Sequence, residues 1–368
     1  MRAQRRGLAA VIAAATTVGL VGCGGDDDKQ ASATSATTEN APKAVSVDVG
    51  GGLTVDTDGK PPKIALFSAG SSNSYLIAQN DQARKSAKEA GLELDVFDGK
   101  IDPANQFKQM QTALVSGKYN AWIVQAIDGQ QTCKLLTEQA PKKGIVVSAI
   151  VVSLCGRAEN EGEELWAPGT LNFIGGNETV EAWKEIWKKA IADNPGPQKV
   201  GVMVGPQLNS ITIAYMAAMK QLLPDDWEVV DTVNTDYSVP DAQAKGQTLI
   251  QANPDLTVLM SAYTNITKGG IAALKAAGRL DEVKIYDGGG TVTGVDYVKK
   301  GITQATTARY SRSPVKASVQ SLVDAFAGKQ VPHFVPNDGH APEPGRDPDS
   351  ALFVVTKDNV DDYQPEND

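Results

Sequence analysis

The chain has 368 residues, a net charge of −9 and a hydrophobic fraction of 41%. This length and apolar content suffice for a packed core and, at roughly 100 to 200 residues per domain, predict two domains and exclude a chain that is disordered throughout. The acidic balance leaves no basic surface of the kind that neutralises phosphates, so nucleic acid is not an expected partner.

The first 22 residues have the pattern of an export signal. Arg2, Arg5 and Arg6 precede an apolar, alanine-rich stretch from Leu8 to Val21, which is the layout of a signal peptide. The stretch is shorter than the ~20 apolar residues of a membrane span, and no cationic stop-transfer patch follows it. We therefore expect a leader over residues 1–22 and no transmembrane anchor. The general secretory route and the twin-arginine route both remain open.

The leader ends in Leu20-Val21-Gly22-Cys23, which resembles the lipobox of bacterial lipoproteins. The resemblance implies that Cys23 is the lipidated first mature residue, which places the protein on the outer face of the bacterial cell membrane or in the periplasm. A free cysteine in a discarded leader is the alternative. Residues 23–60 contain few aliphatic side chains and cannot bury enough apolar surface to order themselves, so they predict a disordered tether.

Two further cysteines, Cys133 and Cys155, follow in the mature chain. Outside the cytoplasm an even pair favours a disulfide over a metal or catalytic site. We predict that the two residues form a disulfide. Two unpaired buried thiols are the alternative.

From Lys63 onward, short apolar runs alternate with amphipathic stretches at helical spacing, which predicts parallel sheets flanked by helices. A first series predicts strands over 64–67, 92–97, 121–124 and 145–150 and helices over 75–90, 103–115 and 130–140. A second series predicts strands over 171–174, 200–204, 227–232, 256–261 and 283–286 and helices over 180–192, 211–223, 242–252 and 267–277. A helix over 313–327, an irregular proline-rich loop over 331–350 and a strand over 351–355 complete the chain.

The order of these elements resembles the type I periplasmic binding proteins, in particular the ribose- and galactose-binding branch of ABC transporter receptors. The passages that carry the likeness are Lys63-Ile64-Ala65-Leu66-Phe67-Ser68 leading into Asn73-Ser74-Tyr75, Asn253-Pro254-Asp255-Leu256 before Ser261-Ala262-Tyr263-Thr264-Asn265, Gly269 to Gly278, and Tyr286-Asp287-Gly288. The resemblance implies an α/β fold of two Rossmann-like lobes joined by a three-strand hinge. It divides the chain into an N-terminal lobe (61–174 plus 310–340) and a C-terminal lobe (175–309 plus 341–368). It also implies a ligand cleft at the carboxyl ends of the strands, which the lobes close by a hinge motion.

Polar and aromatic residues follow the predicted strands at the expected cleft. Planar amides and carboxylates can bond pairs of hydroxyl groups, and aromatic rings can cover the C–H surface of a sugar. By position, the candidate ligand contacts are Asn73, Tyr75, Gln125, Asp128, Asn209, Tyr263, Asn265 and Asp287. The resemblance adds Asn177 and Arg309, and it implies that Asp287 accepts hydrogen bonds from sugar hydroxyls and that Arg309 touches the ligand from the hinge.

Each candidate also has a plain structural role as its alternative. Asp287 could be a turn residue before a glycine run, and Arg309 an exposed partner in a salt bridge. The two tyrosines could be half-buried packing residues, and Asn177 could cap the following helix.

Two departures from the family pattern bear on the ligand. Val151-Val152-Ser153-Leu154 stands where pentose- and hexose-binding relatives place an Asp-Arg pair, and Ile211-Thr212-Ile213-Ala214-Tyr215 stands where an arginine is expected. These departures imply a less charged pocket and argue against a standard aldose.

The expected function is therefore that of a monomeric substrate-binding protein. It would capture a small polar solute, a sugar or polyol, and deliver it to an ABC permease without any cofactor. A ligand-sensing receptor of the same fold, or a non-sugar solute such as an amino acid or nucleoside, remains open.

The sequence contains no motif typical of a common catalytic or metal-binding site. The chain has two histidines, no Gly-x-Ser-x-Gly elbow and no His-Glu-x-x-His motif, which argues against an enzyme. His333 and His340 flank Asp338, with Glu343 beyond, but metal sites normally bring together three or four ligands, so we expect exposed histidines and no metal. Gly288-Gly289-Gly290 lacks the spacing of a nucleotide loop and predicts a turn.

Overall fold

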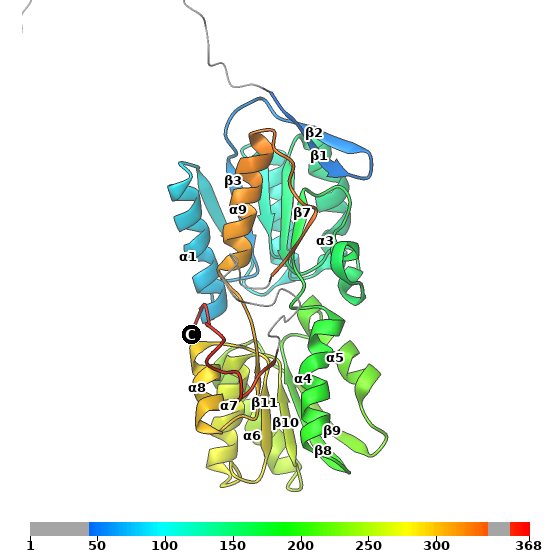
Figure 1. Ribbon diagram of the computed structural model, residues 1–368, viewed down its shortest axis with the longest axis vertical. Helices are drawn as coiled ribbons and strands as arrows, with labels where there is room; N and C mark the ends of the chain where they lie inside the picture. Colours follow the sequence, from blue (N-terminus) through cyan, green and yellow to red (C-terminus); the bar gives the residue numbers. More distant parts are fainter. Residues whose placement is uncertain (1–43, 338–353) are drawn as a thin grey trace, which may run out of the picture. The chain divides into compact units, whose positions relative to one another are not determined.

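Two wholly parallel sheets, each covered by helices, form the framework of the chain (Figure 1). The computed structural model describes residues 44–337 and 354–368. The predicted leader, Cys23 and most of the predicted strand over 351–355 lie outside these residues, as do His340, Asp338 and Glu343. The predicted α/β fold of parallel sheets flanked by helices is confirmed.

The first sheet, which with its helices we call the N-lobe, has six strands in the order β13-β7-β6-β5-β3-β4. The strands are β3 (Ile64–Ser68), β4 (Leu94–Asp98), β5 (Ala121–Val124), β6 (Val146–Val151), β7 (Asn172–Gly175) and β13 (Phe334–Pro336). The helices are α1 (Ser74–Glu89), α2 (Pro103–Ser116), α3 (Gly129–Lys134) and α9 (Ser313–Phe326). Strands β3, β5, β6 and β7 are buried along their whole length, which explains their continuous apolar sequence.

The second sheet, which with its helices we call the C-lobe, has the order β11-β10-β8-β9. Its strands are β8 (Gln198–Val204), β9 (Trp227–Asn234), β10 (Val258–Ser261) and β11 (Lys284–Asp287). Its helices are α4 (Val180–Asp193), α5 (Ser210–Leu222), α6 (Val239–Ala252), α7 (Thr264–Ala276) and α8 (Val292–Lys300). A short antiparallel pair, β12 (Thr306–Thr307) with β14 (Val354–Val355), adjoins this sheet through a bridge between Tyr286 and Ala305.

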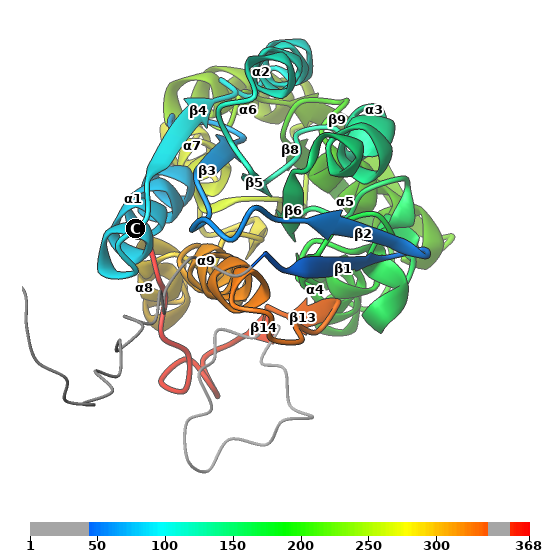
Figure 2. The same ribbon diagram turned by 90° about the horizontal axis from the view of Figure 1, so that it is seen from above.

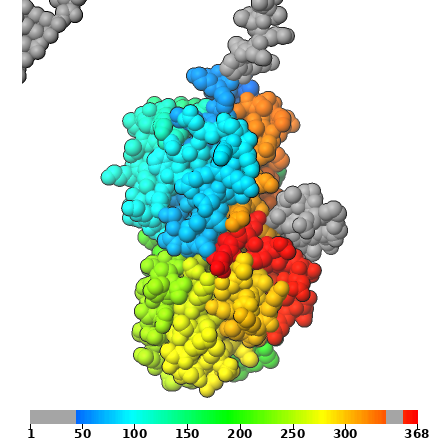
Figure 3. Space-filling model, turned by 90° about the vertical axis from the view of Figure 1, so that its left-hand side faces the viewer, coloured from blue at the N-terminus to red at the C-terminus, as the bar shows by residue number. Residues whose placement is uncertain are grey.

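The chain passes from the N-lobe to the C-lobe after β7 and returns to the N-lobe between β12 and α9. The third crossing that the resemblance implies falls within residues 338–353, outside the described part of the chain. After β14, the last residues run along the boundary of the two lobes (Figure 3). There Glu366 accepts hydrogen bonds from the backbone N–H groups of Arg312 and Ser313 at the start of α9, and Thr293 of α8 donates to Asp368.

The segment before Lys63 contradicts part of the expected tether. Strands β1 (Ser46–Gly50) and β2 (Leu53–Asp56) form an antiparallel hairpin, visible at one end of the N-lobe in Figures 1 and 2. Val47, Val49 and Val55 are buried in the main hydrophobic core, and the carbonyl of Val49 accepts a hydrogen bond from Gly169. The disorder prediction was wrong for residues 44–60, because alternate valines supply the apolar face that composition alone did not show.

The predicted helix over 130–140 is also more complex than expected. An α-helix occupies Gly129–Lys134, a π-helical turn follows over Leu135–Gln139, and a 3₁₀ turn ends at Lys143. Cys133 lies in this α-helix and forms a disulfide with Cys155, which confirms the predicted pairing. The bond joins α3 to the loop that leaves β6.

Candidate functional site

A pocket lies at the carboxyl ends of both sheets, and almost every strand end contributes to it. Its space, including the part open to solvent, is about 530 Å³. The N-lobe provides Ala69, Asn73, Tyr75, Leu76, Ile101, Gln125 and Val151, and the segments leading into and through the C-lobe provide Glu178, Asn209, Ile211, Tyr237, Ala262, Tyr263, Gly288 and Arg309. Ligands of open α/β sheets bind at this edge because the connecting loops diverge there.

Two of the polar lining residues are helix caps, which fixes their orientation. Asn73 precedes α1 and its Oδ1 accepts from Leu76 N at 3.0 Å, while Asn209 precedes α5 and its Oδ1 accepts from Ile211 N at 2.9 Å. A cap of this kind satisfies one of the free N–H groups of the first helical turn. Each Oδ1 thus accepts one hydrogen bond from its own helix, and each asparagine can offer its Nδ2 donor and the second lone pair of Oδ1 to a ligand.

Hydrogen bonds between the lobes border the pocket on two sides. On one side the Tyr263 hydroxyl accepts from Tyr75 N at 3.2 Å and lies 3.4 Å from Ser74 Oγ. On the other side Ser210, at the start of α5, donates its backbone N–H to Ile127 O, and its hydroxyl accepts from Gly129 N, both at 3.1 Å. The lobes are therefore in direct contact on both borders of the pocket.

Three tyrosines give the pocket an aromatic lining. Tyr75, Tyr237 and Tyr263 are each 8% exposed, and the Tyr237 and Tyr263 rings meet edge to face with centroids 6.1 Å apart. Burial raises the pKa of Tyr263 to about 12 and raises the pKa values of Tyr75 and Tyr237 as well. The three hydroxyls are thus neutral groups; that of Tyr75 donates to Tyr310 O and can offer a ligand only an acceptor.

Backbone strain is concentrated in the pocket wall. Ile101, Val151 and Tyr237 have φ angles of 55°, 67° and 66°, in the left-handed region that residues with a Cβ rarely adopt and that is a true outlier for β-branched side chains. Gly205 leaves the room that Tyr237 needs, because a Cβ there would lie 2.0 Å from the tyrosine ring. Strained residues of this kind persist only where the surrounding structure holds them, and they gather at binding sites.

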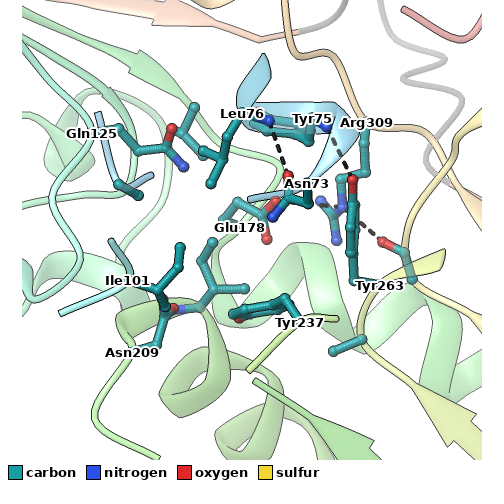
Figure 4. Close-up of a pocket in the computed structure, with 15 residues that line it drawn as sticks. Asn73, Tyr75, Leu76, Ile101, Gln125, Glu178, Asn209, Tyr237, Tyr263 and Arg309 are labelled. Carbon is teal, nitrogen blue, oxygen red and sulfur yellow. Dashed lines mark hydrogen bonds and ion pairs between the residues drawn. The ribbon is translucent and has the colours of Figure 1, made fainter. Parts of the chain in front are cut away.

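Arg309 and Glu178 form a buried pair of opposite charge at one end of the pocket (Figure 4). The Arg309 guanidinium lies 3.9 Å above the centroid of the Trp183 ring, and its Nε donates to Gly288 O at 3.2 Å and lies 3.5 Å from Glu178 Oε1. Tyr363 fixes the backbone of Arg309 by accepting from its N–H and donating to its carbonyl. Burial raises the pKa of Glu178 to about 7, although the Arg309 charge opposes this rise.

Six of the predicted ligand contacts lie in this pocket, namely Asn73, Tyr75, Gln125, Asn209, Tyr263 and Arg309. Asn177 lines a smaller cavity beside it, together with Glu178 and Arg309. Asp128 caps α3 by accepting from Gln130 N and Gln131 N, and Asn265 lies in the first turn of α7 outside the lining. The arginine is 2% exposed, which overturns its alternative as an exposed salt-bridging residue.

Asp287 has a different place from the predicted one. It is the last residue of β11, is fully buried, and does not line the pocket. Its carboxylate accepts hydrogen bonds from the hydroxyls of Thr264, Thr267 and Thr306 at 2.8, 2.5 and 2.6 Å. Burial raises its pKa, and these hydroxyls oppose the rise. In this structure the Asp287 carboxylate is therefore bonded by protein hydroxyls behind the pocket wall, and its contact with sugar hydroxyls stays a prediction.

Two further lining residues, Glu178 and Tyr237, were not predicted from the sequence. Glu178 adjoins the predicted Asn177 and lines the main pocket, whereas Asn177 lines the smaller cavity beside it. Tyr237 follows β9 at the same sheet edge as the predicted contacts. Its position after a strand was the available signal.

No helix within residues 44–337 and 354–368 is long and apolar enough to cross a membrane. The same residues contain no group of three or more His, Cys, Asp or Glu side chains that could hold a metal ion. His333 stacks on Trp166 with ring centroids 3.9 Å apart, and its Nδ1 lies 3.0 Å from Leu171 O.

Comparison with known proteins agrees with this architecture. The chain matches the periplasmic binding protein domain over residues 64–330. The D-ribose/D-allose-binding protein of Pseudomonas aeruginosa is 19% identical over 277 residues, which cover 74% of this chain and 84% of that protein. The Caulobacter myo-inositol binding protein bound to myo-inositol has a TM-score of 0.68 and 16% identity, over 83% of this chain and 97% of that one. A solute binding protein of an ABC transporter from Actinobacillus succinogenes with bound D-allose has a TM-score of 0.61 and 20% identity, over 82% and 100%. The chain belongs to the periplasmic binding protein family, in its type I, ribose-like branch.

Proposed function

We propose that the protein binds a neutral sugar or polyol and delivers it to the permease of an ABC transporter. The observation that carries this proposal is the pocket itself, which combines amide and tyrosine side chains from both lobes with the carboxyl ends of both sheets. Amides and phenolic hydroxyls can bond a set of ligand hydroxyls, while the tyrosine rings can cover its C–H faces. Relatives with the same fold are described with bound D-allose, myo-inositol, allitol and D-fucose.

The charges of the pocket favour a ligand without net charge. When Glu178 is ionised, it and Arg309 bring one negative and one positive group to the same end of the pocket. An anionic ligand attracted by Arg309 would be repelled by the nearby Glu178 carboxylate. A cationic ligand attracted by Glu178 would be repelled by Arg309. In a buried site neither charge is well screened, so a neutral ligand is favoured.

The position of the protein in the cell is part of the proposal. The leader pattern before Cys23 and the cysteine pair Cys133–Cys155 support export, because disulfides persist in oxidising compartments. We propose a lipid anchor on Cys23 and a monomer that acts as a binding protein and not as an enzyme. Replacing Cys23 by serine should move the protein from the membrane fraction to the soluble fraction; retention in the membrane would contradict the anchor.

A thermal-shift screen tests the binding function. The chain from residue 24 onward would be melted with ribose, D-allose, myo-inositol, allitol, D-fucose, glycerol, amino acids and nucleosides. A ligand present at 100 times its Kd stabilises the folded state by about 2.7 kcal/mol, which for a chain of this size raises the Tm by about 4 °C. A shift with a sugar or polyol supports the proposal. A shift confined to amino acids or nucleosides would overturn the ligand class.

A further inference from the structure

One oxygen of the Glu178 carboxylate has no hydrogen-bond partner within the part of the chain that the structure describes. The side chain is 9% exposed. Its Oε1 lies 3.5 Å from Arg309 Nε, whereas its Oε2 is buried and makes no hydrogen bond. A buried acceptor without a donor costs about 1–3 kcal/mol, and more when it is charged, so such groups in folded proteins call for an explanation.

Glu178 is placed to meet a ligand. It follows β7 in the first crossing between the lobes, directly before Thr179, the residue that caps α4. It lines both the main pocket and the smaller cavity beside it. In Figure 4 the carboxylate points into the group of lining side chains, with Asn73 above it, Arg309 beside it and Tyr237 below.

The neighbouring groups of the pocket do not fill the vacant acceptor position. The titratable groups around Glu178 are Arg309, which contacts the other carboxylate oxygen, and the hydroxyls of Tyr75, Tyr237 and Tyr263. The Tyr75 hydroxyl donates to Tyr310 O, and the Tyr263 hydroxyl is engaged with the start of α1. Asp287 lies outside the lining and is held by threonines.

We infer that Glu178 Oε2 accepts a hydrogen bond from a hydroxyl group of the bound ligand and makes this residue a determinant of ligand specificity. The inference rests on the proposed sugar or polyol function and deepens it. A ligand must present a hydroxyl donor at this position. A ligand with a carboxylate there, as in a sugar acid, is rejected, because two carboxylates would face each other in a buried site.

Proton linkage follows from this contact. Burial raises the pKa of the unliganded Glu178 to about 7, so near neutral pH a substantial fraction is protonated. A hydroxyl that donates to the carboxylate favours the ionised form and lowers this pKa. Binding should therefore release protons near pH 7, and affinity should fall as the pH drops below about 7. The three tyrosines remain neutral over this range, because burial raises their pKa values. Burial lowers the pKa of Arg309 and the Glu178 charge opposes this, but a guanidinium group stays charged near neutral pH.

Isothermal titration calorimetry tests the inference. D-Allose and myo-inositol, and any other sugar or polyol that shifts the Tm, would be titrated at pH 7 in two buffers of different ionisation enthalpy, which gives the number of protons released. Wild-type protein should release protons on binding, and Glu178→Gln should release none and bind about tenfold more weakly. Glu181→Gln is the matched control: it removes an acid that pairs with Lys184 outside the pocket and should behave as the wild type.

The possible outcomes separate this inference from the proposed function. If no sugar or polyol binds the wild-type protein, the proposed function is wrong, and the inference, which depends on it, is wrong as well. If a sugar or polyol binds without proton release, and Glu178→Gln binds it equally well, the function stands and the inference is wrong. If Glu178 served only to pair with Arg309, Glu178→Gln would lower the Tm of the unliganded protein, while ligand binding to wild type would be free of proton release.

Discussion

Replacing Tyr263 by phenylalanine tests whether the contacts between the lobes contribute to ligand affinity. The hydroxyl of this C-lobe residue accepts from Tyr75 N at 3.2 Å and lies 3.4 Å from Ser74 Oγ, both in the N-lobe. Phenylalanine keeps the ring, and with it the edge-to-face contact to Tyr237. The substitution therefore removes the contacts of the hydroxyl, both to the N-lobe and to a bound ligand, and keeps the packing of the ring.

The size of the effect follows from the geometry. Both contacts are long, so together they contribute about 1 kcal/mol, near the middle of the range for a net hydrogen bond. If the lobes separate when the pocket is empty, these bonds exist only in the closed state that holds the ligand. Their loss should then weaken binding about fivefold and leave the unfolding free energy of the unliganded protein almost unchanged.

Calorimetric titration of the best ligand from the thermal-shift screen measures this change. Tyr119→Phe is a suitable control because the Tyr119 hydroxyl donates to Asp95 within the N-lobe, at 2.7 Å. It should leave affinity at the wild-type value. Equal affinities of Tyr263→Phe and wild type would refute the argument that these contacts belong to the closed state, and so would an equal loss in both variants.

Two further predictions concern groups behind the pocket wall. Asp287→Asn should lower the free energy of unfolding by about 3 kcal/mol, because buried hydroxyls that donate to the carboxylate lose acceptors; urea denaturation measures this, and reduced affinity at unchanged stability would instead indicate direct ligand contact. Replacing both Cys133 and Cys155 by serine should destabilise the protein by about 3 kcal/mol, as expected for a loop closed at a sequence separation of 22. An unchanged Tm of the double variant would contradict this.

The fold was predictable because its strands are buried on both faces. Runs such as Ile64–Ser68 and Val146–Val151 are continuously apolar, and the helices between them carry helical periodicity, so the alternation could be read from the sequence. The hairpin over Ser46–Asp56 was not predicted because its apolar residues are few and three consecutive glycines, Gly50 to Gly52, interrupt them. The short strand Thr306–Thr307 is two residues long, and its pairing with β14 is not a property of local sequence.

The sequence was sufficient to predict that the site lies at the ends of the strands. It was not sufficient to predict which residues after each strand line the pocket. Asn73 and Asn209 were found because each precedes a helix after a strand, where both capping and ligand contact occur. Whether a residue at such a position faces the pocket depends on its neighbours. Gln125 directly follows β5, and Asp287 is the last residue of β11. Gln125 lines the pocket, whereas Asp287 does not, because its carboxylate accepts hydrogen bonds from three threonines behind the wall. Asn177 and Glu178 are neighbours in the loop after β7, and local sequence does not distinguish which of the two lines the main pocket.

The left-handed residues of the pocket wall bear on attempts to stabilise this protein. Each of Ile101, Val151 and Tyr237 costs of order 1–3 kcal/mol in backbone energy, so a change to glycine at any of them relieves strain in the folded state. Each such change would also remove a side chain that shapes the cavity, and Val151 and Tyr237 are 3% and 8% exposed. Deleting a buried side chain costs about 1–5 kcal/mol, as much as the strain that is released or more. The strain is therefore tied to the shape of the pocket and cannot be removed as a separate route to higher stability.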